Sequence, residues 1–366
     1  MKHTLTTLLL ILTGLPLTGQ EPLFTHRALE KSYEQLRPET ILEDEQGFLW
    51  IGGSAGLFRY DGLQYEPFRM PDSLCNNEVT AIFEEEGGRL WVGYADGRIF
   101  REHAGLQFRL WEPEEGLPAV PITGIRQSRS GQVWIATYGE GLYSYHNNRM
   151  YNINTDDGLP GDDLYTLEID GRGQAWVGTD GGVSICSMKG QKKYLQHLTR
   201  ADGLPDEIVR AIIPAEAGKF WIGTYGAGVT LYDPARKEFQ PLNSQWPYRP
   251  VNALLYIKGK ELWIGTEGDG LLRWDIHSGR IQALQQKPLE DGKISALHLD
   301  SEGNLWVLHR SEGIFMANRR FELVEARLPD IQAVLETKNG QVFVGTQHGL
   351  YRYQPQQGEY QRIKPE

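Results

Sequence analysis

The chain has 366 residues, with 48 acidic and 37 basic side chains and a formal net charge of −11. An acidic surface disfavours nucleic acid and anionic membranes as partners, because both attract basic patches. Two cysteines are too few for a disulfide scaffold, and 42 glycines favour a turn-rich β protein over a helical one.

Residues 1–19 have the pattern of a secretory signal peptide. Lys2 precedes an apolar run over residues 5–12, and small residues follow up to Gly19. Gly14 interrupts the apolar stretch, which is shorter than the roughly 20 residues that a spanning helix needs. No later segment is long and apolar enough to cross a bilayer. The sequence therefore predicts a periplasmic or secreted protein without membrane insertion after signal removal.

A motif centred on one aromatic residue recurs through residues 20–366 at intervals of about 42 residues. Its consensus is an apolar residue, the aromatic anchor, a β-branched residue and a small residue, as in Leu49-Trp50-Ile51-Gly52. Large aromatics at a fixed repeat position are expected to be structural and buried between repeats. The eight anchors are Trp50, Trp91, Trp134, Trp176, Trp221, Trp263, Trp306 and Phe343.

Each repeat contains four segments with the pattern of short β-strands. An alternating apolar run such as 79–83 precedes the anchor strand, and an Asp- and Gly-containing turn such as 44–47 separates the two. A glycine turn, a third strand and a fourth strand follow, as at 138–141, 142–145 and 150–153. Four strands in about 42 residues predict an all-β fold, a single β-propeller of four-stranded antiparallel blades.

The number of blades depends on how the ring closes. Eight anchors predict an eight-bladed ring, but residues 23–26 resemble a fourth strand without a blade of its own, and residues 359–363 supply another outer strand. We expect the amino-terminal strand to dock beside the last repeat, because an open sheet edge promotes aggregation. A seven-bladed ring with one additional repeat is the alternative.

Cys75 and Cys186 lie several repeats apart, so they are not expected to reach the few ångströms that a disulfide requires. We expect two free, mostly buried thiols without a catalytic or metal-binding role.

The composite motif resembles the two-component regulator propeller repeat, which forms the periplasmic sensor half of hybrid two-component systems. The match is best over Leu49 to Asp61, residues 74–79, and Leu262 to Asp275. The resemblance implies a ligand-sensing or ligand-binding module, often for oligosaccharides. No kinase is expected within these 366 residues. The resemblance therefore implies either signalling through a separately encoded partner such as a histidine kinase, or a stand-alone or decayed relative of such sensors.

A ligand is expected on one face of the propeller. In this fold the connections from the second to the third strand, and from each blade to the next, emerge around the same mouth of the channel. Exposed aromatic rings and convergent polar groups there would suit an oligosaccharide or another polar small molecule. The predicted ligand-binding residues are Tyr94, Tyr138, Glu140, Tyr225, Trp246, Arg249, Glu267, Asp269, His309, Arg310 and His348.

The sequence contains no phosphate-binding loop, zinc-ligand cluster or calcium loop. We therefore predict no catalytic residue, no bound metal and no cofactor. One alternative is an exported lyase or hydrolase with a cation-dependent site on the same face, because His309 and His348 occupy corresponding places in adjacent repeats near Glu267. A further alternative is a protein-interaction scaffold.

Overall fold

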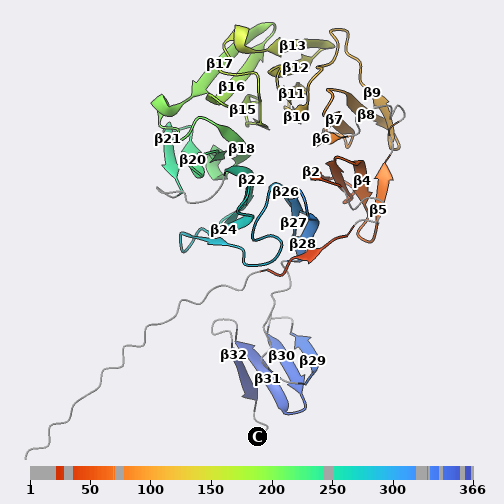
Figure 1. The fold of residues 1–366 in the computed structure, drawn as a ribbon, viewed down its shortest axis with the longest axis vertical. Helices are drawn as coiled ribbons and strands as arrows, with labels where there is room; N and C mark the ends of the chain where they lie inside the picture. The colour runs from red at the N-terminus through yellow and green to blue at the C-terminus, as the bar shows by residue number, and fades with distance from the viewer. Residues whose placement is uncertain are drawn as a thin grey trace, which may run out of the picture. The chain divides into compact units, whose positions relative to one another are not determined.

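The computed structural model of the chain describes residues 22–28, 36–68, 70, 78–242, 250–318, 328, 330–337, 341–354 and 359–363. The described residues form eight four-stranded antiparallel sheets (Figure 1). This confirms the predicted all-β fold and the four-stranded repeat. The predicted signal peptide, Cys75, Trp246 and Arg249 lie outside the described residues.

Seven of the sheets belong to one compact unit, Phe24–Arg319. Its first three blades are β2 (Pro38–Glu43), β3 (Leu49–Gly53), β4 (Gly56–Tyr60) and β5 (Tyr65–Phe68); β6 (Val79–Glu84), β7 (Leu90–Tyr94), β8 (Ile99–Ala104) and β9 (Gln107–Leu110); and β10 (Ile122–Gln127), β11 (Val133–Thr137), β12 (Leu142–His146) and β13 (Arg149–Ile153).

Blades four to six follow the same order. They are β14 (Thr166–Ile169), β15 (Ala175–Thr179), β16 (Gly182–Lys189) and β17 (Lys192–Leu198); β18 (Val209–Pro214), β19 (Phe220–Thr224), β20 (Val229–Asp233) and β21 (Glu238–Pro241); and β22 (Val251–Ile257), β23 (Glu261–Thr266), β24 (Leu271–Asp275) and β25 (Arg280–Ala283). Short 3-10 helices occur at η2 (Thr155–Asp157), η3 (Arg200–Asp202) and η4 (Glu216–Gly218).

Blade seven takes its fourth strand from the other end of the chain. It consists of β26 (Ile294–Leu299), β27 (Asn304–His309), β28 (Gly313–Asn318) and the amino-terminal β1 (Thr25–His26). In β1, Thr25 pairs with Met316 and His26 with Phe315. The expectation that the amino-terminal strand docks beside the last repeat is therefore wrong, because it covers the open edge of the seventh.

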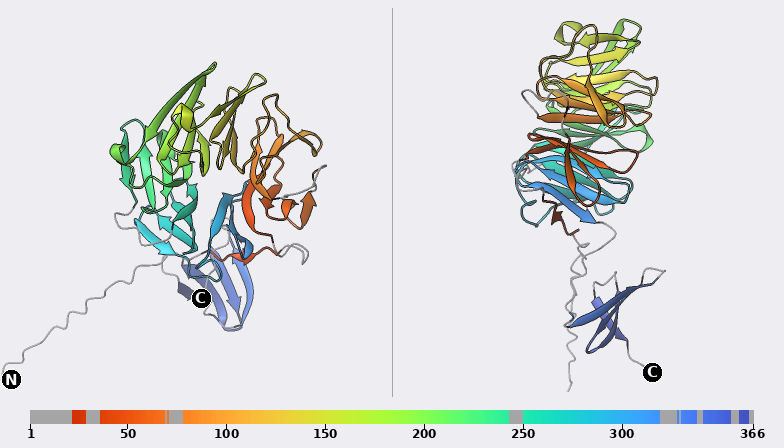
Figure 2. Two further views of the ribbon diagram at one scale, coloured as in Figure 1. Left: turned by 45° about the horizontal axis from the view of Figure 1, so that its top comes forward. Right: turned by 90° about the vertical axis from the view of Figure 1, so that its right-hand side faces the viewer.

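The ring closes with seven blades, as in the alternative above. Blade seven packs directly on blade one, and their shared core includes Ile51, Phe58 and Ile314. The rings of Tyr60 and Trp306 meet edge to face with centroids 5.4 Å apart across this seam. Figures 1 and 2 show these sheets arranged in a ring about a common axis.

The eighth sheet lies in the second compact unit and is described by itself. It is formed by β29 (Ile331–Glu336), β30 (Val342–Thr346), β31 (Gly349–Gln354) and β32 (Glu359–Ile363). It keeps the strand order and the register shift of a ring blade. Its anchor Phe343 is half-buried, and Val334 and Leu335 are exposed.

The seven anchor indoles of the ring are buried. Four of them donate their N–H to a carboxylate six residues earlier, in the turn between the first and second strands. The donor and acceptor pairs are Trp50 with Asp44 at 2.7 Å, Trp91 with Glu85 at 2.9 Å, Trp176 with Asp170 at 3.3 Å and Trp306 with Asp300 at 2.8 Å.

Cys186 is a free thiol buried in β16, and burial raises its pKa to about 12. This thiol stays protonated at neutral pH, so it is a poor nucleophile. None of the helices in the described part of the chain has the length and apolar character needed to cross a membrane.

Candidate functional site at the channel mouth

A β-bulge recurs near the start of the inner strand of the blades. In six ring blades the register shifts by one residue there, and the residue at the bulge is Glu39, Thr80, Thr123, Arg210, Asn252 or Ser295. Tyr165 takes the corresponding place in blade four, where its N–H donates to the carbonyl of Gly178. A bulged residue is left out of the ladder, so its side chain can be aimed differently from those of a regular strand.

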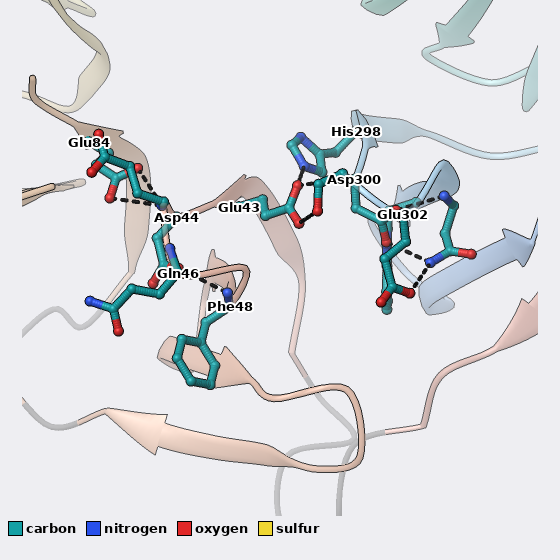
Figure 3. Close-up of polar contacts among 12 residues, drawn as sticks. Glu43, Asp44, Gln46, Phe48, Glu84, His298, Asp300 and Glu302 are labelled. Atoms are coloured by element: carbon teal, nitrogen blue, oxygen red, sulfur yellow. Dashed lines mark hydrogen bonds and ion pairs between the residues drawn. The ribbon is translucent and has the colours of Figure 1, made fainter.

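A cavity of about 540 Å³ lies between the inner strands of five blades. Thr80, Thr123 and Tyr165, all at the bulge position, contribute to its wall. Further along the same strands its wall includes Arg126 and His298, the latter drawn in Figure 3. The bulge residues of blades two, three and four therefore line the channel, and the repeat gives the other blades a residue at the equivalent place of their inner strands.

Several polar atoms at the bulge position are buried and have no hydrogen-bond partner among the described residues. They are Thr123 Oγ1, Arg210 Nε, Asn252 Nδ2 and Ser295 Oγ. Buried polar groups are nearly always paired with protein, water or a ligand, because leaving one unpaired costs about 1–3 kcal/mol. Four such atoms recur at the bulge position of different blades, so this place in the ring repeatedly carries polar side chains.

Tyrosine rings form an arc along blades three to five. Tyr138 and Tyr225 are 45% and 46% exposed, although both belong to strand connections next to the ring core. The ring of Tyr138 lies 5.8 Å from that of Tyr165, whose hydroxyl donates to Asp180 at 2.7 Å. The Arg210 guanidinium lies 4.9 Å from the centroid of Tyr165 and 5.4 Å from that of Tyr225. Arg210 thus connects two aromatic faces of the arc.

Charged side chains continue around blades five to seven and one. Glu267 lies 3.7 Å from Arg210 Nη1 and 3.4 Å from Lys293 Nζ. Arg310 pairs with Glu39 of blade one. Burial raises the pKa of Glu39 above its usual value, although Arg310 and Lys293 act in the opposite direction. Together with the tyrosines, these residues make a continuous polar belt at the mouth.

Tyr94 does not join this belt. Its ring is only 4% exposed and packs edge to face on Phe100, in the core of blade two. The prediction of an exposed ring is wrong here, because the side chain turns inward from the end of β7 and Arg98 covers its face at 5.2 Å.

His309 is buried, with 1% of its surface exposed. Its Nδ1 accepts the backbone N–H of Glu312 at 3.1 Å, so the ring proton is on Nε2, which lies 3.0 Å from the carbonyl of Asp291. Both ring nitrogens thus hold neighbouring loops together. The predicted ligand contact by His309 is not supported by this geometry.

The remaining predicted residues are dispersed. Glu140 accepts the Tyr143 hydroxyl at 2.7 Å, and Asp269 donates its backbone N–H to Thr266 Oγ1 at 2.9 Å, so both take part in their own hairpin turns. His348 is exposed on the eighth sheet. Of the predicted set, the structure brings Tyr138, Tyr225, Glu267 and Arg310 into the belt.

Sequence reasoning missed Glu39, Tyr165, Arg210 and Lys293. The first three occupy the bulge position, which in the sequence is the residue between the first two inward-packing residues of the inner strand, as Arg210 lies between Val209 and Ala211. The signal was a polar or aromatic residue at this place in repeat after repeat. Lys293 immediately precedes β26 and has no such repeat signal.

No family model matches the sequence, and no curated protein matches it. Solved structures do match. One is the extracellular domain of BT3049 from B. thetaiotaomicron, described as a hybrid two-component system, with 19% identity and a TM-score of 0.69 over 94% of this chain and 49% of that one. The extracellular domain of BT4673 from the same organism has 18% identity and a TM-score of 0.68 over 93% and 53%.

The chain therefore spans about half the length of those two domains. The likeness shows that it has the fold of the extracellular propellers of two-component systems, as the repeat motif indicated. A third match is virginiamycin B lyase from Staphylococcus aureus, with 14% identity and a TM-score of 0.64 over 81% of this chain and 100% of the lyase.

Proposed function

We propose that this chain is an exported sensing module that binds an oligosaccharide at the channel mouth and signals through a separately encoded protein such as a histidine kinase. The observation that carries this proposal is the belt itself, in which the exposed rings of Tyr138 and Tyr225 share the channel mouth with the partly exposed charged side chains of Glu267 and Arg310. The fold shared with extracellular domains of two-component systems supports the sensing role.

The chemistry of the belt suits a ligand with many hydroxyls. Sugar hydroxyls donate and accept, so they can pair with the partly exposed carboxylate of Glu267 and guanidinium of Arg310. Flat apolar sugar faces pack on aromatic rings such as Tyr138 and Tyr225. Positive and negative side chains alternate along the belt, which favours a neutral polar ligand over a strongly charged one.

A cation-dependent lyase has less support. A variant of the S. aureus lyase with one histidine replaced by alanine is described as catalytically inactive. At the mouth of this chain, His309 is buried and both of its nitrogens are engaged. Within the described ranges, no three His, Cys, Asp or Glu side chains are grouped so that they could hold a metal ion.

The proposal is tested by thermal shift of the mature protein against a panel of oligosaccharides, with and without chelator. A binding module gains stability with the logarithm of one plus the ratio of ligand concentration to Kd. We expect stabilisation that is indifferent to chelator and occurs without turnover. The double substitution Tyr138→Ala and Tyr225→Ala should abolish the shift and leave the fold intact.

The matched control is Tyr194→Ala, which removes an exposed tyrosine from β17, outside the belt. It should leave the shift unchanged. A chelator-sensitive shift with product formation would favour the lyase instead. Stabilisation by a folded protein partner and by no oligosaccharide would favour the scaffold.

A further inference from the structure

A second cavity, of about 450 Å³, lies between blades four and five at the end of the blades opposite the channel mouth. The turns that bound it, Asp170–Gln174 and 215–219, connect first and second strands, whereas the mouth is built from the other connections. Its floor is formed by β15, β16, β19 and β20, of which β15, β16 and β20 are labelled in Figure 1. The cavity is therefore separate from the belt.

The floor of this cavity is apolar and aromatic. Trp176 stacks on Phe220 with centroids 4.2 Å apart and planes at 21°, and Ile185 and Tyr232 complete the surface. Ile185 pairs with the anchor Trp176, whereas the same place in blades one, two and six holds an arginine whose guanidinium lies over the indole. Blade four has no such arginine, so the space that a guanidinium fills over the indole in blades one, two and six stays open over Trp176.

The rim of the cavity carries positive charge. Arg172 and Lys237 are exposed beside it, and neither has an ion-pair partner among the described residues. Two of the nearby carboxylates are engaged in contacts of their own. Asp170 accepts the backbone N–H groups of Arg172 and Gln174 and the indole N–H of Trp176. Asp233 is 3.1 Å from Lys219 Nζ. A third carboxylate, Glu216 in the turn 215–219, is exposed to solvent.

We propose that this cavity is a second binding site, for a small amphipathic anion with a flat apolar body and one carboxylate. The apolar body would lie on the floor formed by Trp176, Ile185 and Phe220, and the carboxylate would reach Arg172 and Lys237 at the rim. We choose an anion as the ligand because two cations without ion-pair partners flank an apolar floor, although the net charge of the chain is −11. The amides of Gln174 and Gln196 offer further hydrogen bonds.

The test uses phenylacetate as the probe and phenylacetamide as its neutral counterpart, with binding measured by isothermal titration calorimetry and saturation-transfer NMR at low ionic strength. We expect phenylacetate to bind and phenylacetamide to bind at least about tenfold more weakly, because only the anion can pair with the rim. Ile185→Trp, which fills the floor, should abolish binding of the anion.

The double substitution Arg172→Gln and Lys237→Gln keeps the cavity and should weaken phenylacetate binding by about tenfold or more. The matched control, Arg129→Gln with Arg149→Gln, removes two exposed cations from blade three, one in a turn and one at the start of β13, and should have no effect at constant ionic strength. Circular dichroism and thermal melting establish that each variant is folded.

Three outcomes would overturn the proposal: no binding of phenylacetate, equal binding of the amide, or equal effects of the two double substitutions. Concentration-dependent self-association that Ile185→Trp removes would assign the cavity to a second copy of the chain and would also overturn it. Loss of oligosaccharide binding at the mouth would leave this result unchanged, since the two sites share no residue.

Discussion

Glu43 accepts two hydrogen bonds from Ser301, one from the backbone N–H at 2.7 Å and one from the hydroxyl at 2.6 Å (Figure 3). The two residues are 258 positions apart in the chain. The same kind of contact joins Glu84, at the end of β6, to the backbone N–H of Glu45 in blade one at 3.0 Å. The last residue of an inner strand thus reaches the turn of the preceding blade. Glu43 makes this contact across the seam of the ring.

Glu43→Ala is expected to lower the free energy of unfolding by about 1–2 kcal/mol, because it removes a charged acceptor of two hydrogen bonds at the seam. The matched variant is Gln127→Ala, which removes one neutral acceptor, 3.2 Å from the N–H of Glu86, at an internal blade contact. Its effect should be smaller. Urea denaturation measures both, and a larger loss for Gln127→Ala would contradict this account of closure.

Phe24→Ala is expected to cost about 3–5 kcal/mol, since it empties a buried aromatic site. Phe24 is 3% exposed, meets Trp263 edge to face at 6.0 Å and exchanges two backbone hydrogen bonds with the side chain of Gln286. Leu23 is 48% exposed, so Leu23→Ala is the control and should change little. Equal thermal stability of the two variants would mean that the amino-terminal strand does not hold blade seven.

Ala215→Asp is expected to stabilise the ring by roughly 1 kcal/mol. The indole N–H of Trp221 is buried without a hydrogen-bond partner among the described residues, and Ala215 stands six positions before it, where Asp170 serves Trp176. The turn is closed by an equivalent hydrogen bond, because the Ala215 N–H donates to the carbonyl of Lys219 at 2.8 Å as the Asp170 N–H donates to that of Gln174 at 3.0 Å. Between these residues the backbone differs, since Ala217 has a positive φ of 55°.

The mechanism behind this gain can be separated from a general effect of the new charge. In a Trp221→Phe background there is no indole N–H to accept from, so Ala215→Asp should give no comparable gain in thermal or urea denaturation. A gain of the same size in both backgrounds would show that the new carboxylate acts elsewhere.

The repeat could be predicted because the sequence of each blade contains the same local pattern: an alternating strand, an Asp turn, an aromatic anchor and a glycine turn. Closure could not, because Glu43–Ser301 and Thr25–Met316 are contacts between the two ends of the ring and have no local signal. The site was half predicted. Loop position identified Tyr138 as exposed, but whether a ring turns outward like Tyr138 or inward like Tyr94 depends on packing that periodicity does not encode.

His298 is expected to make the ring less stable as the pH falls below about 6.5. Its side chain lines the channel cavity, and burial lowers its pKa, although Glu43 at 3.8 Å and Asp300 act in the opposite direction. Because the folded pKa is the lower one, the unfolded chain takes up the proton first, so stability is present above 6.5 and is lost as the pH falls through the window below it.

His298→Asn removes the titrating group, so the urea midpoint of this variant should fall less between about pH 7 and pH 5 than that of the unsubstituted protein. His146→Asn is the control, because His146 is exposed at the end of β12 and its replacement should leave the slope unchanged. Parallel slopes for His298→Asn and the unsubstituted protein would show that desolvation in the channel does not dominate over the attraction of Glu43. In that case the protonated imidazole would be accommodated at the seam.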